Sequence, residues 1–337
     1  MNKPIMQDIA DALSVSRVTV WKALTGRAGI SDVLREKIKD KAVEIGYVNE
    51  GVMAGMKSIP PRTIATVVSR PESSIFWMQI IHQIAEELSL QGVNLLYTHL
   101  PTSYKEGDNL PISLSDGSVS GIIVLNVYSK PYLKMLADLS VPKVFLDSTP
   151  SVPSNCLGGD LVLIEGRSAT RQITHWLIES GRTRLGFVGD INYAQTNMDR
   201  FHGFKDAHAE RGLAYDEALT LTGPLQLTTH YEQISCFLDS LETMPDGFVC
   251  ASDYIAHFIQ QYFSLHGISE KAVCLTGFDN NAEYVNVANR ITTVDVQTKS
   301  MGERLANKVM FAVNHPGSPT EVCYVSSNII YQPLLKA

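Results

Sequence analysis

Cysteine is scarce in this sequence, and the cysteines that occur follow no recognisable pattern. The 337 residues contain five, an odd number, widely spaced and without a C-x-x-C pair. This argues against a disulfide framework and against a zinc site built on closely spaced ligands. Cys250 and Cys274 lie within apolar strand-like runs. We therefore expect both to be buried thiols without a redox role.

Long apolar runs are also missing. No stretch reaches the roughly 18 residues that a membrane-spanning helix needs, and no early apolar segment has the form of a signal peptide. We therefore expect a cytoplasmic protein in a reducing compartment, with no membrane as a partner.

The motifs of the common enzyme classes are absent as well. The sequence contains no G-x-S-x-G, Walker A or H-E-x-x-H pattern, and Gly158-Gly159 does not make a phosphate loop. The nine histidines are scattered and suggest no pairing of a nucleophile with a base. We expect a protein that is not an enzyme, with no catalytic residues, no cofactor and no metal site.

Positive charge is not in excess overall, but it is unevenly distributed. The formal net charge is −7. Residues 1–60 nevertheless contain nine lysines and arginines against seven aspartates and glutamates, whereas the rest of the chain contains 19 against 28. A mildly basic first segment on an acidic body fits contact with DNA that is confined to the first segment.

Apolar residues at helical spacing predict two short helices near the start, separated by a break at Ser14-Val15. Ser16 is suited to cap the second helix because its hydroxyl can accept a hydrogen bond from a backbone N–H of the first turn. Arg17 and Lys22 fall on the outward face of this helix. Two such helices form a helix-turn-helix. Their apolar positions are Ile9, Ala10 and Leu13, then Val15, Val20 and Leu24.

A third helix is predicted from about Asp32 to Ile45, with Ser31 as its cap and Gly46 at its end. The three helices make a small bundle, for which a generic interaction module is the alternative to DNA binding. Residues 47–62 follow, and Pro60-Pro61 stops any helix there. We interpret this segment as a marginal helix that acts as an order–disorder hinge, or else as a plain linker.

From Arg62 onward, strand-like apolar runs alternate with amphipathic helices, which is typical of a parallel sheet covered on both faces. The theme occurs twice, so we predict two α/β lobes with a ligand cleft outside the carboxyl ends of the strands. The predicted strands span 64–68, 93–97, 121–125, 143–147, 185–189, 247–251, 272–276, 291–295 and 322–331. The predicted helices span 77–90, 132–139, 166–179, 201–211, 231–241, 255–265 and 299–313.

The first segment resembles the DNA-binding headpiece and hinge of the lactose-repressor (LacI) family of transcriptional regulators. The family pattern is I-x-D-V-A-x-x-A-x-V-S-x-x-T-V-S-R-x-L-N, followed later by R-x-x-V and L-G-Y. The matching segments are Asp8-Ile9-Ala10, Val15-Ser16-Arg17-Val18-Thr19-Val20, Arg35-Glu36-Lys37-Ile38 and Ile45-Gly46-Tyr47.

The resemblance implies a role for each residue of the second helix. Arg17, Val18 and Lys22 occupy the base-reading positions. Arginine and lysine commonly contact guanine, and valine can pack on a thymine methyl group. Ser16 and Thr19 would contact phosphates.

The chain also departs from the family pattern. Ser14 replaces the usual turn glycine, and Trp21-Lys22 replaces the usual Ser-Arg. Trp21 is expected to pack on the sugar–phosphate backbone or to fill the small core. Met56 stands where the family has the leucine that wedges into the minor groove, and methionine is an accepted wedge residue.

The rest of the chain resembles the periplasmic-binding-protein-like effector domain of the same family. The resemblance implies that Arg200 and Asp279 bind the effector. The chemistry agrees, since a guanidinium fork donates to two vicinal oxygens and a carboxylate accepts from hydroxyls. The matching segments are Gly181-Arg182-Thr183-Arg184-Leu185-Gly186-Phe187-Val188-Gly189-Asp190, Asp199-Arg200-Phe201-His202-Gly203-Phe204, Gly277-Phe278-Asp279-Asn280 and Thr292-Thr293-Val294.

Further residues are candidates for the same cleft. Phe76 or Trp77 could stack on a ring of the ligand. Glu165 either lies near the cleft, where it would favour an amino or hydroxyl-rich ligand, or caps the helix that starts beside it. The remaining effector-binding candidates are Asp147, Asp190, Tyr193 and Asp253, and additional rim candidates are Ser69, Gln195 and Ser252.

These observations predict an all-α helix-turn-helix headpiece joined to an α/β bilobed effector domain with two doubly wound parallel-sheet lobes. The headpiece spans 1–47, the hinge 48–62, and the effector-binding and dimerisation domain 63–337. Lobe 1 comprises about 63–158 and 297–325, and lobe 2 about 159–296 and 326–337.

The function that we predict is that of a repressor that binds specific DNA sequences. A homodimer would present two headpieces to a pseudo-palindromic operator, and a sugar or sugar-like effector in the cleft would control binding. The alternatives are a solute-binding protein and an α/β enzyme with an appended DNA-binding module. The headpiece counts against the first alternative, and the lack of a catalytic motif counts against the second.

Overall fold

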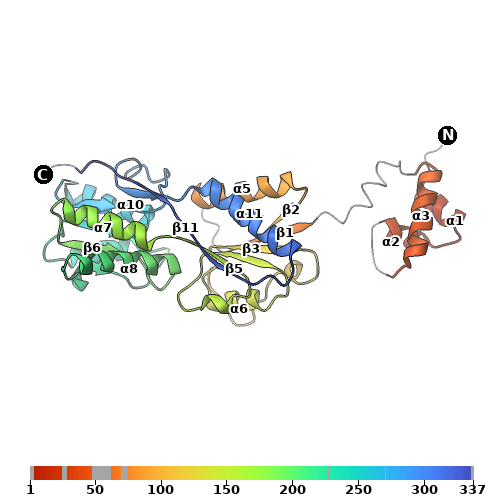
Figure 1. The fold of residues 1–337 in the computed structure, drawn as a ribbon, viewed down its shortest axis with the longest axis horizontal. Helices are drawn as coiled ribbons and strands as arrows, with labels where there is room; N and C mark the ends of the chain where they lie inside the picture. Colours follow the sequence, from red (N-terminus) through yellow and green to blue (C-terminus); the bar gives the residue numbers. More distant parts are fainter. Residues whose placement is uncertain are drawn as a thin grey trace. The chain divides into compact units, whose positions relative to one another are not determined.

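The computed structural model forms two compact units, Met1–Arg62 and Thr63–Ala337 (Figure 1). The structure describes residues 4–24, 29–47, 62–69, 75–226, 228–269 and 271–334. Most of the predicted hinge, with Met56, lies outside the described residues. We refer to the first unit as the headpiece and to the second as the body.

The headpiece contains the helices α1 (Met6–Ala12), α2 (Arg17–Leu24) and α3 (Asp32–Glu44). Ser16 caps α2 as predicted, because its Oγ accepts a hydrogen bond from the backbone N–H of Thr19 over 3.0 Å. Ser14 lies in the turn with a φ of 51°, a left-handed conformation that favours glycine. The turn therefore keeps its usual geometry with serine in place of the usual glycine. The core consists of Ile9, Ala10, Val20, Ala23, Ile38 and Ala42.

Short-range chemistry also sets the limits of α3. Ser31 accepts a hydrogen bond from the backbone N–H of Leu34 over 3.4 Å, and Gly46 follows the helix with a φ of 72°. Arg35 ties α3 to the end of α2, since its Nη1 donates to the carbonyl oxygens of Lys22 and Ala23. The last carbonyl oxygens of a helix have no hydrogen-bond partner within the helix. Arg35 provides that partner for two of them and holds the end of α2 in place.

Lobe 1 of the body is a six-stranded parallel sheet in the order β11-β5-β4-β3-β1-β2. The helices α5 (Ile75–Leu90) and α11 (Thr298–Asn314) cover one face, and α6 (Lys130–Ala137) covers the other (Figure 1). Because both faces are covered, the strands read as continuous apolar runs. The strands are β1 (Thr63–Val68), β2 (Asn94–His99), β3 (Gly121–Leu125), β4 (Lys143–Leu146), β5 (Asp160–Ile164) and β11 (Val322–Val325).

Lobe 2 contains a four-stranded parallel sheet in the order β7-β6-β8-β9, with one continuous apolar core. Its strands are β6 (Leu185–Val188), β7 (Thr220–Leu221), β8 (Gly247–Cys250) and β9 (Cys274–Thr276). Its helices are α7 (Arg167–Glu179), α8 (Gln195–Glu210), α9 (His230–Asp239) and α10 (Asp253–His266). Helix α7 lies beside α8, and α9 lies beside α10.

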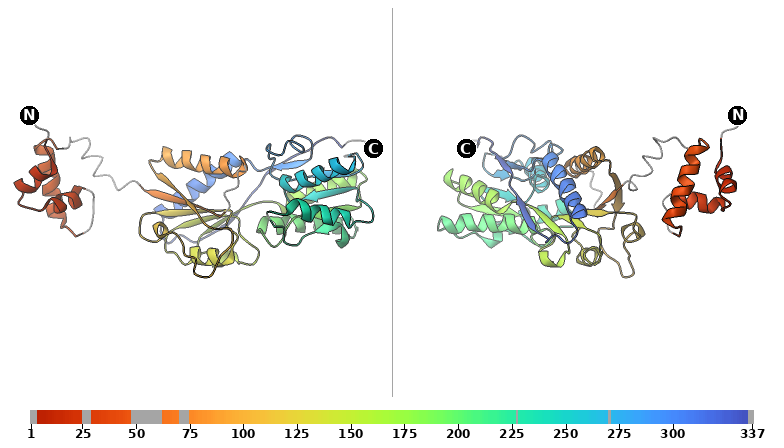
Figure 2. Two further views of the ribbon diagram at one scale, coloured as in Figure 1. Left: turned by 180° about the vertical axis from the view of Figure 1, so that it is seen from behind. Right: turned by 45° about the vertical axis from the view of Figure 1, so that its right-hand side comes forward.

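The chain passes between the lobes several times (Figure 2). One passage is a two-stranded antiparallel sheet of β10 (Thr293–Asp295) and β12 (Asn328–Ile330), in which Val294 pairs with Ile329. The prediction of a single strand over 322–331 is therefore wrong. Its first half, β11, pairs in lobe 1, and its second half, β12, pairs with β10.

The predicted boundary of lobe 1 after residue 158 is also wrong. Strand β5 pairs with β4 and β11 inside the six-stranded sheet, where Leu161 lies opposite Phe145 and Leu163 opposite Tyr324. The five residues of β5 are all buried, as a central strand with two covered faces requires. The chain leaves lobe 1 only after Ile164.

Among the described residues of the body, single-turn 3-10 helices lie at Ile112–Leu114, Ser154–Cys156 and Glu217–Leu219. Across the ranges that the structure describes, we find no helix with the length and apolar character needed to cross a membrane.

Candidate functional site

A cleft of the body lies between the two lobes and has a volume of about 490 Å³. Part of its wall comes from residues that follow strand ends, as expected for parallel sheets. Asn126 follows β3, Asp147 follows β4, Asp190 comes shortly after β6, and Asp279 comes shortly after β9. Seven of the eight predicted effector-binding residues line this cleft: Phe76, Trp77, Asp147, Asp190, Tyr193, Arg200 and Asp279.

Arg200 of α8 is 5% exposed and lies on the wall of the cleft. Its Nη2 is 3.7 Å from Oδ1 of Asp279, and its Nη1 donates to the carbonyl oxygen of Ala251. Its guanidinium carbon lies 3.6 Å from the centroid of the Phe278 ring, a cation–π contact. Among the described residues, Arg200 Nε has no hydrogen-bond partner. A buried donor of this kind is available to a bound ligand.

Asp253, a predicted effector-binding residue, is not among the residues that line the cleft. Its Oδ1 accepts a hydrogen bond from Thr293 Oγ1 over 2.7 Å, and its Oδ2 accepts from the backbone N–H of Asn281 over 2.8 Å. A Cβ at Gly277 would lie 2.0 Å from Oδ1, so only glycine fits there. Asp253 thus holds the loop that carries Asp279, which has a strained φ of 102°.

Burial of Asp253 has a consequence for stability. Burial raises the pKa of Asp253 from an ordinary value of 3.8 to about 6, against the opposing effect of its hydrogen bonds. The folded state then binds more protons than the unfolded state between these two pKa values, so stability falls as the pH rises through this window.

We expect Asp253→Asn to be less stable than the wild type, with a deficit that shrinks as the pH rises from 4 to 7. The shrinkage should be up to about 3 kcal/mol, since one pKa unit corresponds to about 1.4 kcal/mol. Urea unfolding of both proteins at several pH values measures it. A deficit that is constant over this pH range would contradict the raised pKa.

Asp147 joins the two lobes at the floor of the cleft. Its Oδ2 accepts a hydrogen bond from Thr196 Oγ1 of α8 over 2.6 Å and from Tyr128 Oη over 3.3 Å. Its Oδ1 accepts from the backbone N–H of Ser148 over 2.8 Å. Burial raises the pKa of Asp147, while these bonds and the nearby Arg200 act in the opposite direction. The carboxylate is thus a contact between lobes on the cleft surface.

Tyr193 forms a second contact between the lobes. Its hydroxyl donates to Asn126 Oδ1 over 3.3 Å, and its ring lies 4.2 Å from the ring of Tyr128. The carboxylate of Asp190 is engaged in a turn, since its Oδ1 accepts the backbone N–H groups of Asn192 and Tyr193. Asp190 therefore shapes the cleft wall by fixing the position of Tyr193.

Aromatic side chains line the cleft from both lobes. Phe76 and Trp77 of α5 pack edge to face, with centroids 5.2 Å apart. In lobe 2, the ring centroid of Tyr254 lies 5.2 Å from that of His230 and 5.5 Å from that of Tyr284. These rings offer flat apolar surfaces on which a ring-shaped ligand can stack.

A third contact between the lobes lies beside these rings. The Glu283 carboxylate accepts a hydrogen bond from the backbone N–H of Ile75, the first residue of α5, over 3.3 Å. The partial positive charge of a helix N-terminus favours a carboxylate at this place.

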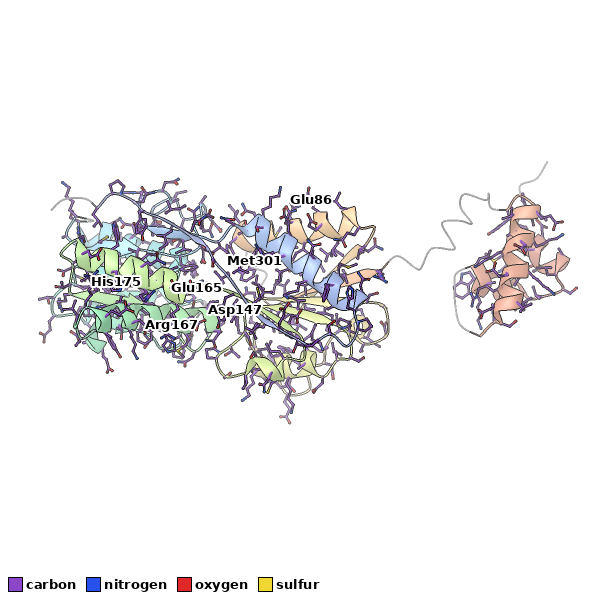
Figure 3. All side chains as sticks on the ribbon, viewed as in Figure 1. Glu86, Asp147, Glu165, Arg167, His175 and Met301 are labelled. Carbon is purple, nitrogen blue, oxygen red and sulfur yellow. The ribbon has the colours of Figure 1, made fainter. Side chains whose placement is uncertain are left out.

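The remaining sequence candidates have structural roles. Glu165 caps α7, since its carboxylate accepts the backbone N–H groups of Ser168 and Ala169. It lies where the lobes meet, as does Asp147 (Figure 3). Ser252 caps α10 and also lines the cleft. Gln195 bonds to Asp199 away from the cleft.

Ser69 lines a smaller hollow of about 220 Å³ beside the cleft. This hollow shares Asn126, Tyr128 and Tyr193 with the cleft, so these three residues separate the two spaces. Among the described residues, Asn126 Nδ2 has no hydrogen-bond partner. Like Arg200 Nε, it is available to a ligand.

Sequence reasoning missed 14 of the 22 residues that line the cleft. Asn126 and Tyr128 come just after the predicted strand 121–125. Because ligands bind outside the carboxyl ends of parallel strands, this position was a signal for both residues. Leu146 and Ile164 end the strands β4 and β5. The others lie in helices or loops, whose approach to the cleft depends on how the lobes pack. The cleft residues not predicted are Asn126, Tyr128, Leu146, Ile164, Ala194, Thr196, Asn197, Leu225, His230, Tyr254, Ile255, Asn281, Glu283 and Tyr284.

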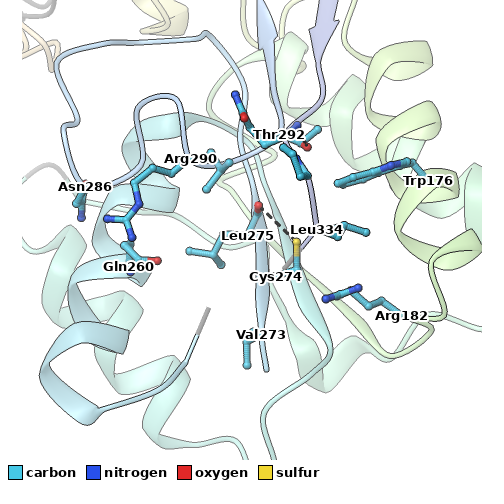
Figure 4. Close-up of a pocket in the computed structure, with 13 residues that line it drawn as sticks. Trp176, Arg182, Gln260, Val273, Cys274, Leu275, Asn286, Arg290, Thr292 and Leu334 are labelled. Atoms are coloured by element: carbon cyan, nitrogen blue, oxygen red, sulfur yellow. Dashed lines mark hydrogen bonds between the residues drawn. The ribbon is translucent and has the colours of Figure 1, made fainter. Parts of the chain in front are cut away.

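A separate, much smaller cavity of about 40 Å³ lies in lobe 2 beside the start of β9 (Figure 4). Its walls include Trp176, Arg182 and Cys274. Burial raises the pKa of Cys274 to about 11 and raises that of Cys250 well above its ordinary value, so both thiols stay protonated at neutral pH. Cys250 is buried as expected, while Cys274 is half-buried.

In the headpiece, α2 presents a surface that differs from its core face. Val20 and Ala23 are buried, whereas Arg17, Val18 and Trp21 are exposed. Trp21 is 42% exposed and is not part of the core, so the alternative that it fills the core is wrong. The core face is already occupied by smaller side chains from all three helices.

The polar residues predicted to contact DNA from α2 differ in their exposure to solvent. Lys22 is half-buried. The hydroxyls of Ser16 and Thr19 share a hydrogen bond of 2.8 Å at the start of the helix. Ser16 is exposed and Thr19 half-buried. The exposed start of a helix that carries no acidic residue in its first turn is suited to approach a phosphate group.

Comparison with known proteins gives consistent likenesses. A family model described as a periplasmic binding protein-like domain matches residues 174–331. The regulator CelR of Thermobifida fusca is 24% identical over 327 residues, which cover 95% of this chain and 94% of CelR. The repressor PurR of Haemophilus influenzae is 23% identical over a region that covers 92% of this chain and 91% of the PurR chain.

Solved structures share the fold. A complex of the regulator CelR with cellobiose has a TM-score of 0.71 at 22% identity and covers 97% of this chain and 98% of its own. The lac repressor dimer bound to operator and the anti-inducer ONPF has a TM-score of 0.68 at 15% identity, with both chains covered fully. A regulator from Enterococcus faecium with bound ribose has a TM-score of 0.66 at 18% identity, covering 82% of this chain and 99% of its own.

Proposed function

We propose that this chain, a member of the LacI family of transcriptional regulators, is a repressor whose binding to DNA is controlled by a small molecule in the cleft. One observation carries the proposal. The same chain combines a helix-turn-helix that exposes Arg17 and Val18 with a bilobed body whose cleft wall contains the Arg200–Asp279 pair.

The cleft chemistry favours a ligand rich in hydroxyl groups. The carboxylates of Asp147 and Asp279 are acceptors for hydroxyls, and Arg200 Nε and Asn126 Nδ2 are buried donors without partners among the described residues. Flat aromatic surfaces from both lobes suit the apolar face of a sugar or a base. A volume of about 490 Å³ lies within the usual range of small-molecule sites. We therefore infer a carbohydrate effector.

The contacts between the lobes suggest how such a ligand acts. Asp147–Thr196, Tyr193–Asn126 and Glu283–Ile75 all join lobe 1 to lobe 2 beside the cleft. A ligand that replaces or strengthens these contacts binds one arrangement of the lobes better than another. Only such a difference in affinity shifts the equilibrium between them. The linker joins β1 of lobe 1, so lobe 1 is the part through which a change reaches the headpiece.

The regulator acts as a homodimer in the cytoplasm under this proposal. Two headpieces then read successive half-sites of a pseudo-palindrome. The relatives that cover more than nine-tenths of the chain are named as regulators of transcription, which supports regulation over catalysis.

A combined binding experiment tests the proposal. The full-length protein is used to select duplexes from a random-sequence library, and sugars, sugar phosphates and nucleosides are screened for thermal stabilisation. We expect an enriched palindrome, and a stabilising compound that changes the affinity for it. Failure to enrich any sequence would refute DNA binding. A stabilising compound without effect on DNA affinity would refute control by the ligand.

A further inference from the structure

The headpiece exposes large apolar side chains on one side. Three of its large apolar side chains, Ile5, Val18 and Trp21, are 59%, 61% and 42% exposed. They line one open hollow of about 500 Å³ together with Met6, Gln7 and Arg17. A contiguous exposed apolar surface on a small domain marks a contact with another molecule. We refer to Ile5, Val18 and Trp21 as the α2 apolar surface.

The geometry of α2 explains why these side chains gather. Val18 and Trp21 are three residues apart, and Arg17 and Trp21 are four apart, so all three lie on one side of the helix. Val20 and Ala23 occupy the core side. Ile5 lies directly before α1 and completes the surface from the neighbouring helix. The surface is therefore held in position by two packed helices.

The charges around this surface favour a polyanion as its partner. Arg17 lies at its border, and α2 contains no acidic residue. In duplex DNA, the apolar group that the major groove presents is the C5-methyl of thymine. The apolar surface matches this methyl group. The guanidinium at its border matches the phosphates and the guanine acceptors that lie nearby in the same groove. A second protein would not need the border to be cationic.

We propose that the α2 apolar surface selects thymine methyl groups in each DNA half-site, with Trp21 as a specificity-determining residue. The inference rests on the proposed function and deepens it, since it names what the headpiece reads besides guanine. Trp21 adds to Val18 a larger flat surface, which can cover more than one methyl group.

The test changes the DNA rather than the protein, so it does not depend on the folding of a variant. Each thymine in the duplex selected by the full-length protein is replaced in turn by deoxyuridine, which lacks the methyl group. We expect about fourfold weaker binding for each methyl that is lost from the contact, as for one buried CH₂ group. Replacing a cytosine at such a position by 5-methylcytosine should recover binding relative to cytosine.

Two variants complete the test. Trp21→Ser should lose the discrimination between thymine and deoxyuridine at the affected positions. Val33→Ala, at an exposed apolar residue of α3 outside the hollow, should keep it. An enriched duplex whose deoxyuridine versions bind equally well overturns this inference alone. If no sequence is enriched, both the inference and the proposed function fail.

Discussion

Replacing Arg200 by alanine is expected to abolish the response to the effector while DNA binding persists. The guanidinium is nearly buried, stacks on Phe278 and faces Asp279, so it is fixed before a ligand arrives. Each hydrogen bond to a charged group contributes about 1.5–3 kcal/mol. Loss of the fork should therefore weaken effector binding by about 100-fold or more. Calorimetric titration with the stabilising compound measures this, and a gel shift measures DNA binding.

Two further variants separate binding from folding. Arg200→Met keeps most of the side-chain volume and should also fail to bind the compound, which excludes a collapsed cavity as the cause. Arg171→Ala removes a surface arginine of α7 that pairs with Glu210 and should bind normally. If the compound binds Arg200→Ala as tightly as it binds the wild type, the cleft is not the effector site.

The second large effect is expected for the double variant Arg17→Ala/Lys22→Ala. Each contact of a cation to guanine contributes about 1–3 kcal/mol of discrimination, so two losses should weaken specific binding by about 30-fold or more. The variant should also show a smaller dependence of affinity on salt, because fewer counterions are released. Gel shifts at several salt concentrations with the selected duplex measure both quantities.

The matched control for this variant lies on α3. Lys41→Ala removes one positive charge that pairs with Glu44 on the surface of the same headpiece. It should leave the sequence preference unchanged. The assignment of α2 as the reading helix would be wrong if the double variant kept the selectivity of the wild type for the selected duplex over a scrambled one.

Much of the headpiece could be predicted from the sequence because its signals are local. The cap at Ser16 and the helix end at Gly46 depend on backbone groups within a few residues, and both appear in the structure. The alternation of strands and helices in the body is local as well, and it predicts most of the elements. The resemblance to the family then placed Arg200 and Asp279 together, although they are far apart in the chain.

The tertiary structure alone distinguishes the roles of residues that look alike in the sequence. Asp253 and Asp279 are both acidic residues that follow strands of lobe 2, yet Thr293 and Asn281 engage the first and leave the second on the cleft. Strand β5 belongs to lobe 1 because β4 and β11 lie on either side of it.

The exposure of Trp21 was decided in the same way. The sequence by itself determined the helix-turn-helix, the two α/β lobes and the residue types of the site, because caps and apolar periodicity act over a few residues. Packing between distant elements determined that Trp21 is exposed, and which carboxylates line the cleft. Those outcomes depend on partners that lie tens of residues away, and local patterns do not specify them.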